Sequence, residues 1–153
     1  MKKLIRDRRG RVLEFSQERL DGLVYFKLEF KTVCAAYVNC QIDGEVLVLV
    51  DIFVEDNCVV RHPDWLKRLF GHKTLTVNFR NQGIGGQLLA TVTAYAKSKG
   101  LKRVEASLAE KDLHPHSQLS RWYEKRGFTV RESGVFKDLV PLARDDSRYM
   151  PKA

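Results

Sequence analysis

The chain has 153 residues, of which 44% are hydrophobic and 30% charged, the composition of a globular protein with a single core. The longest apolar run, residues 46–50, is far too short to cross a bilayer, and the charged first residues lead into no signal-peptide segment. We therefore expect one domain over residues 1–153, no membrane span and, because the net charge is +8, an anionic partner.

The cysteines indicate a reducing compartment. Cys34, Cys40 and Cys58 are odd in number, show no C-x-x-C spacing and lie in strand-like, mostly apolar stretches. This pattern predicts buried free thiols rather than disulfides, and with them a cytoplasmic protein. We expect a monomer or a homodimer.

The N-terminal residues are basic. Residues 1–11 carry six cations and one carboxylate, which fits either a solvated surface or contact with an acidic or nucleic-acid partner. Weak alternation predicts a strand over residues 11–15, and a polar connection follows over residues 16–22.

Three stronger β-patterns come next, over residues 23–30, 32–42 and 45–54. Asp43-Gly44 predicts a tight turn, so the last two segments should form an antiparallel hairpin. Residues 45–54 are apolar on both faces, as expected of a strand at the centre of a sheet.

A long connection follows the central strand. Residues 64–70 predict a short helix that ends at Gly71, and residues 73–77 return to extended structure. The segment 55–73 is longer than most connections, and we interpret it as a substrate lid, a partner surface or a packed surface excursion.

A glycine turn then opens a helix. Residues 80–86 read Arg-Asn-Gln-Gly-Ile-Gly-Gly, and apolar side chains at helical spacing predict a helix over residues 84–99, ended by Gly100. The first amides of a helix have no partner within it and lie at the positive end of its dipole, so a turn without side chains favours phosphate binding there. Gln87 stands where a P-loop needs Lys, and the third glycine of a dinucleotide fingerprint is missing.

The C-terminal third alternates strands and helices. Residues 102–108 predict a strand, a helix follows Pro115 and ends at Gly127, and residues 128–130, 134–140 and 147–150 read as short β-segments. Antiparallel strands followed by a β-α-β-α-β pattern predict one mixed α/β or α+β domain.

Two motifs resemble the GNAT N-acetyltransferase superfamily. Residues 79–85, Phe-Arg-Asn-Gln-Gly-Ile-Gly, are similar to its pyrophosphate loop, and residues 122–128, Trp-Tyr-Glu-Lys-Arg-Gly-Phe, are similar to its second signature. The resemblance implies a mixed, splayed β-sheet flanked by helices, with a shortened N-terminal helical region in this chain. It also implies direct transfer of an acetyl group from acetyl-CoA to a primary amine of unknown class.

The resemblance further implies roles for single residues. Tyr123 is expected to protonate the CoA sulfur, and the extended residues Leu75 and Val77 to bind the pantetheine arm. His116 stands where many members carry an asparagine that contacts the cofactor. The residues expected at the pyrophosphate are Arg80, Asn81, Gln82, Gly83, Ile84, Gly85 and Gly86.

The general base stays open at this point. Asp51 and Glu55 on the central strand and Glu110 after the following strand are the candidate carboxylates. Each also fits a structural or solvated acid, and a water can relay the proton instead.

Two other functions compete with acetyl transfer. Glu105 lies about twenty residues after the glycine turn, where a dinucleotide-binding oxidoreductase would place a ribose-binding acid. A non-catalytic CoA- or nucleic-acid-binding module on the same fold is the other alternative. His114 and His116 alone make a weak metal motif, and we expect no metal.

Overall fold

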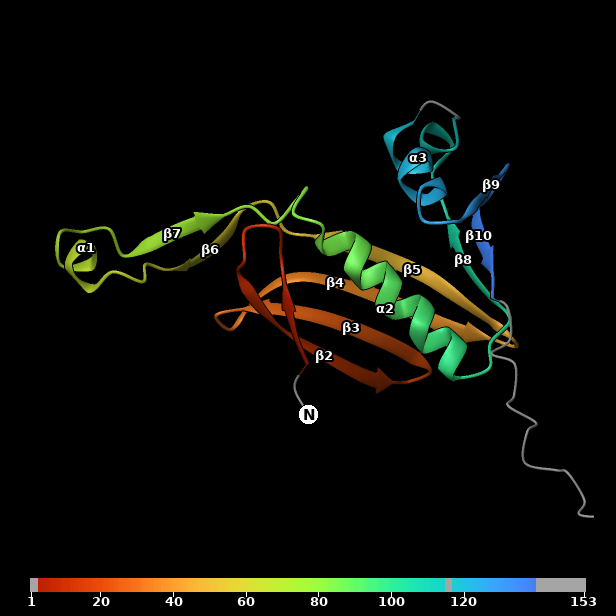
Figure 1. Cartoon of the computed structure of the whole chain (residues 1–153), viewed down its shortest axis with the longest axis horizontal. Coiled ribbons are helices and arrows are strands. Elements are labelled where there is room, and N and C mark those ends of the chain that lie inside the picture. The colour runs from red at the N-terminus through yellow and green to blue at the C-terminus, as the bar shows by residue number, and fades with distance from the viewer. Residues whose placement is uncertain (1–2, 115–116, 140–153) are drawn as a thin grey trace, which may run out of the picture.

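The computed structural model describes residues 3–114 and 117–139 (Figure 1). An eight-stranded sheet forms the body of the molecule, in the order β1-β2-β3-β4-β5-β8-β10-β9. Its strands are β1 (Lys3–Arg6), β2 (Val12–Leu20), β3 (Leu23–Phe30), β4 (Val33–Asp43), β5 (Val46–Val54), β8 (Arg103–Ser107), β9 (Thr129–Arg131) and β10 (Gly134–Asp138).

The first five strands form an antiparallel meander, as the hairpin signal at Asp43-Gly44 predicted for β4 and β5. The sequence prediction was wrong for residues 16–22: β2 runs on to Leu20 and turns into β3 through Asp21-Gly22. Residues 17–20 are exposed, so both faces of this part of the strand contact solvent. The polar side chains there therefore do not mark the end of the strand. Strand β1 was also not predicted, although Ile5 is buried against the core.

The sheet opens in its middle. Strand β5 lies between β4 and β8, at the centre as predicted, and its parallel ladder with β8 runs only from Val46–Arg103 to Leu49–Ala106. A register shift in the β4–β5 ladder falls beside the end of this pairing, between Asn39 and Cys40, and leaves Val50 as the extra residue. Beyond Leu49 the carboxyl half of β5 has no partner in β8, which is the expected splay.

Helix α2 (Ile84–Ser98) covers one face of the sheet. Its apolar stripe packs on β4, β5 and β8, and Tyr95 meets the Phe26 ring edge-on at 5.3 Å between centroids. Its last turn ends before Gly100, whose φ of 72° is the left-handed conformation predicted for a glycine there. The buried side chains of α2 are Ile84, Leu88, Leu89, Val92, Thr93 and Ala96.

The other face of the sheet is open. In the described part of the chain no helix precedes Trp65, so the expected shortening of the N-terminal helical region leaves β2 to β5 uncovered on this side. We define the open face as the side chains of these strands that point away from α2. They include Ser16, Glu18, Tyr25, Lys27, Glu29, Tyr37, Asn39, Asp51 and Phe53.

A ribbon projects from the end of β5. Strand β6 (Cys58–Arg61), which the sequence did not predict, pairs with β7 (Thr74–Val77) in a separate two-stranded sheet. Helix α1 (Trp65–Leu69), predicted within one residue at each end, lies at the tip and is capped by Asp64, whose Oδ1 accepts from the Leu66 N–H. We call residues 58–77 the arm.

Two short helical elements lie between β8 and β9: the 3₁₀ helix η1 (Glu110–Asp112) and α3 (Gln118–Glu124). Helix α3 begins at Gln118 and is capped by Ser117, whose hydroxyl accepts from the Ser120 N–H at 3.0 Å. Pro115, which was expected in its first turn, lies outside the described residues. None of the helices in the described part of the chain has the length and apolar character that spanning a membrane requires. The β-segment expected over residues 147–150 lies outside the described residues.

The cysteines are free thiols, and Cys40 and Cys58 are buried as predicted, whereas Cys34 is half-buried. Burial raises the pKa of the Cys40 thiol from 9.0 to about 12. Between these two pKa values the folded chain keeps a thiol proton that the unfolded chain releases. The contribution of the neutral Cys40 thiol to the free energy of unfolding is therefore complete below pH 9 and is lost as the pH rises towards 12.

Between about pH 8 and about pH 10.5 we expect the ionisation of Cys40 alone to lower the free energy of unfolding by about 2 kcal/mol. Urea unfolding of the wild type and of Cys40→Ala at about pH 8 and pH 10.5 measures this contribution, and the variant should lose less stability. An equal loss in both proteins would contradict the assignment.

Candidate active site

The glycine turn begins α2 with bare amides. Asn81 and Gly83 both have positive φ, 58° and 81°, which turns the chain sharply into the helix. Gly83 is the N-cap residue and makes no side-chain hydrogen bond to the first turn. The N–H groups of that turn therefore have neither an intrahelical partner nor a side-chain cap.

A pocket of about 510 Å³ opens onto this turn. We call it the glycine pocket. Residues from β5 and α3 form its walls, and no described carboxylate lines it. Its lining is Arg8, Ile52, Val54, Phe79, Arg80, Asn81, Gly83, Ile84, Gly85, Gly86, Gln118, Leu119, Trp122 and Arg126.

The structure brings most of the predicted pyrophosphate residues to this pocket: all of residues 80–86 line it except Gln82. Gln82 lies beside it, with its carbonyl oxygen accepting from the Arg8 N–H at 3.1 Å. Leu75 and Val77 do not line the pocket, because β7 pairs with β6 in the arm.

Arg8 reaches the pocket because the N-terminal turn docks on the start of α2. Besides the Arg8–Gln82 bond, Gln87 Nε2 donates to the Arg6 carbonyl at 2.9 Å. Arg11 fixes the same turn: its Nε lies 2.5 Å from Asp7 Oδ2 and its guanidinium 4.4 Å from the Phe79 ring centroid. The Arg11 contact lowers the pKa of Asp7 even though burial opposes it. Residues 3–11 are thus part of the fold rather than a free basic arm.

Arg126 forms the opposite wall. Its guanidinium lies 4.1 Å from the Trp122 ring centroid, and Nη1 donates to the Trp122 carbonyl at 2.7 Å. A Cβ on Gly86 would stand 2.8 Å from Arg126 Nη2, so a glycine is needed for this approach. Burial lowers the pKa of Arg126, and the nearby charge of Arg8 lowers it further. Two arginines that repel each other across a pocket favour an anion between them.

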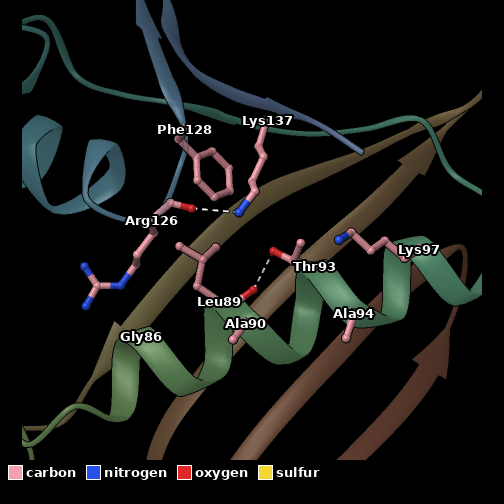
Figure 2. Close-up of a pocket in the computed structure, with 9 residues that line it drawn as sticks. All are labelled: Gly86, Leu89, Ala90, Thr93, Ala94, Lys97, Arg126, Phe128 and Lys137. Carbon is pink, nitrogen blue, oxygen red and sulfur yellow. Dashed lines mark hydrogen bonds between the residues drawn. The ribbon is translucent and has the colours of Figure 1, made fainter. Parts of the chain in front are cut away.

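A second cavity extends this cationic surface (Figure 2). It measures about 330 Å³ and shares Gly86 and Arg126 with the glycine pocket. Lys97 on α2 and Lys137 on β10 add two further cations, and no carboxylate is among its described lining residues. Lys137 Nζ is held by the Arg126 carbonyl at 2.7 Å. The two adjoining cavities therefore place cationic side chains along α2 from its first turn, beside Arg126, to its last, which carries Lys97.

Tyr123 lies in the core beside the pocket. Its side chain is 2% exposed and meets the rings of Trp122 and Phe128 edge-on, at 4.8 and 5.3 Å between centroids. Trp122 lines the glycine pocket, whereas Tyr123 does not. Burial raises the pKa of Tyr123 to about 12, so the phenol is protonated at neutral pH.

The three candidate bases lie in different surroundings. Asp51 is on the open face and accepts from the Tyr37 hydroxyl at 2.9 Å, while Ile52 and Val54 of the same strand line the glycine pocket from the other face. Glu55 Oε1 accepts from the N–H groups of the next two residues, at 3.1 and 3.0 Å, and so shapes the turn into the arm. Glu110 is exposed at the start of η1.

The remaining sequence candidates do not add to the site. His116 lies outside the described residues. Glu105, the possible ribose-binding acid, is paired with Arg103 at 3.2 Å and does not line the glycine pocket. Within the described residues no group of three or more His, Cys, Asp or Glu side chains could hold a metal ion.

A family model described as the acetyltransferase (GNAT) domain matches residues 29–130. The chain belongs to the GNAT acetyltransferase family. The match contains both sequence motifs and the whole of the arm, and it begins after the N-terminal turn that carries Arg8. No curated protein is similar enough in sequence to match.

Solved GNAT structures share the fold. The PaiA N-acetyltransferase of Thermoplasma acidophilum, in complex with coenzyme A, is 14% identical with a TM-score of 0.53 over 77% of this chain and 62% of its own length. The ribosomal-protein-S18-alanine N-acetyltransferase of Escherichia coli is 16% identical, with a TM-score of 0.54 over 86% of this chain and 77% of its own. The cAMP-binding acyltransferase of Mycobacterium smegmatis is 10% identical, with a TM-score of 0.60 over 99% of this chain and 50% of its own. This GNAT chain thus spans about half to three quarters of these proteins.

Sequence reasoning missed two arginines in this GNAT site. Arg126 belongs to the second motif, but its role follows from the closeness of Gly86, which no local pattern shows. Arg8 was seen only as one of several cations in residues 1–11. The signal that could have separated Arg8 is its place between Asp7 and Gly10, residue types typical of a tight turn. In the structure a hydrogen bond of 3.0 Å from the Gly10 N–H to the Asp7 carbonyl closes this turn, and the Arg8 N–H is held by Gln82.

Proposed function

We propose that this protein transfers an acetyl group from acetyl-CoA directly to a primary amine. The observation that carries the proposal is the glycine pocket, where the uncapped start of a 15-residue helix is flanked by Arg8, Arg80 and Arg126. Amides at the positive end of a helix, together with guanidinium groups, match the charge and the hydrogen-bond acceptors of a diphosphate. The CoA bound to a structural neighbour supports this choice of donor.

The open sheet gives the two substrates separate approaches. The donor enters from the α2 face, and the gap beyond Leu49 and Ala106 lets a thioester reach the edge of β5. The acceptor amine enters from the open face, where Asp51 lies. A free lysine amine has a pKa near 10.4, so a base must take its proton before attack, either Asp51 directly or a water held there.

The leaving group needs stabilisation as the thioester breaks. Thiolate charge develops on the CoA sulfur, and Tyr123 is the proposed donor. Full proton transfer from a phenol of pKa about 12 to a thiolate of ordinary pKa, about 8.5, is uphill. The phenol therefore acts first as a hydrogen-bond donor to sulfur, in a buried site where such a bond is strong.

An acetyl-CoA consumption assay tests the proposal across small amines, protein lysines, protein N-termini and aminoacyl-tRNA, with mass spectrometry of each product. Acetylation of one class supports it and names the acceptor. Calorimetry with acetyl-CoA and with NADH separates the alternatives. Tight acetyl-CoA binding without transfer to any class would indicate a non-catalytic CoA-binding module, and preference for NADH would exclude acetyl transfer.

Arg8→Ala should raise the Kd for acetyl-CoA about tenfold, because an exposed guanidinium–phosphate contact contributes on the order of 1–2 kcal/mol. Arg9→Ala is the matched control: the neighbouring arginine is exposed and does not line the pocket. Calorimetry at two salt concentrations should show a smaller salt dependence for Arg8→Ala only. Equal affinities for the two variants would remove Arg8 from the donor site.

A further inference from the structure

The tip of the arm exposes large apolar side chains. Trp65, Leu69 and Phe70 are 61%, 71% and 82% exposed, and α1 has no buried residue. The arm extends away from the body of the sheet, so the rest of the described chain, residues 3–57, 78–114 and 117–139, does not cover this surface (Figure 1). A helix of one turn gains little stability by itself, and clustered apolar side chains on a projecting element indicate a partner.

The arm is also cationic. Arg61, Lys67, Arg68 and Lys73 face only one carboxylate within it, that of Asp64. Lys67 and Arg68 alternate with the apolar residues of α1, so charge and apolar surface occur together. A partner for the arm must therefore be both apolar and acidic.

The open face has these two properties. Among the side chains that define it are the carboxylates of Glu18, Glu29 and Asp51 and one cation, Lys27, whose Nζ pairs with Glu29 at 2.8 Å, in a chain whose net charge is +8. Tyr37 and Phe53 stack at 5.5 Å between centroids and add aromatic surface. Among these side chains lies a hollow of about 290 Å³, lined by Ser16, Glu18, Tyr25, Phe26, Lys27, Cys34, Tyr37 and Asn39.

We infer that the arm of one copy docks on the open face of a second copy, and that the second arm returns the contact. In a dimer with one twofold axis, the arm and the open face of each chain are both buried against the partner. This is the closed arrangement that a self-complementary interface produces. Aromatic and leucine side chains of α1 fill the hollow, while Lys67 and Arg68 meet Glu18 and Glu29.

Docking also affects the acceptor site, a consequence that rests on the proposed function. The partner's arm would lie over Tyr37, Asp51 and Phe53, on the side from which the amine approaches. The acceptor pocket of the dimer is therefore built from two chains, and the arm replaces the missing cover on this face of the sheet.

Sedimentation of the full chain with reversed charges tests the inference. The arm variant is Lys67→Glu with Arg68→Glu, and the face variant is Glu18→Lys with Glu29→Lys. The wild type should be a dimer at about 100 μM, and each variant alone a monomer, because both of its interfaces are then repulsive. An equimolar mixture should form a heterodimer, since each arm then meets a face of opposite charge, and the variant with all four changes should dimerise with itself.

The matched control for the arm variant is Lys111→Glu with Lys125→Glu. It changes the net charge by the same amount as the arm variant, at exposed positions outside the arm, and should leave the dimer intact. A monomeric wild type at this concentration would overturn the inference, as would a dimer that persists in both single-surface variants. Monomeric wild type bound through Trp65 to phosphatidylserine vesicles would assign the arm to a membrane surface instead. None of these readouts depends on acetyl transfer, so the inference and the proposed function fail separately.

Discussion

Gly83→Val is expected to abolish acetyl-CoA binding, raising its Kd by at least about 100-fold. Gly83 has a φ of 81°, which a β-branched residue cannot adopt without strain, and a side chain there would begin 3.4 Å from Arg8 Nε. The variant must either rotate the turn, which redirects the first amides of α2, or displace Arg8. Both changes misplace phosphate donors, and a misplacement of about 1 Å can cost 100-fold.

Gly100→Val separates binding from stability. Gly100 closes the other end of α2 with a φ of 72° and has open space around its Cβ, so the two glycines impose the same kind of strain. The control should lose thermal stability, as Gly83→Val does, and keep the Kd of the wild type in calorimetry. Gly85→Val should also lose binding without backbone strain, since its Cβ would stand 3.3 Å from the Trp122 ring. Wild-type affinity in either turn variant would contradict this account of the pocket.

Local patterns predicted the parts of the fold in which one face is buried. Helix α2 followed from Ile84, Leu88 and Val92 at helical spacing between two glycine signals, and the structure buries those three residues. The hairpin of β4 and β5 followed from a turn between two apolar runs. In each case burial and turn chemistry agree, so the pattern has one solution.

The predictions failed where neither face is buried or where contact is distant. The second half of β2 is exposed on both faces, so its sequence resembles a connection although its backbone is paired with β3. Strand β6 spans four residues and is stabilised by pairing with β7, which follows it in the sequence only after α1 and its flanking turns. Arg8 enters the site through a backbone bond to Gln82, far along the chain, and no local pattern carries that information.

The open sheet connects the site with the inferred dimer. Strand β5 presents Ile52 and Val54 to the glycine pocket and Asp51 and Phe53 to the open face. A protein with two additional helices over this face would build its acceptor site within one chain. In this chain β2 turns into β3 through Asp21 and Gly22 alone, and in the inferred dimer the partner's arm supplies the cover.

Tyr123→Phe should lower kcat about 100-fold while changing the Kd for acetyl-CoA by less than about threefold, the range typical of removing one positioned acid. The ring contacts with Trp122 and Phe128 remain in the variant, so the glycine pocket keeps its wall and the free energy of unfolding changes by about 1 kcal/mol or less. Tyr95→Phe is the matched control. Tyr95 also packs edge-on, but against Phe26, which does not line the pocket, whereas Trp122, the ring partner of Tyr123, does. Since the pKa of Tyr123 is about 12, the pH profile of kcat should keep its shape below about pH 10 and lose height only. An unchanged kcat would remove Tyr123 from the mechanism, and a weaker Kd with the same kcat would make it a positioning residue for Trp122.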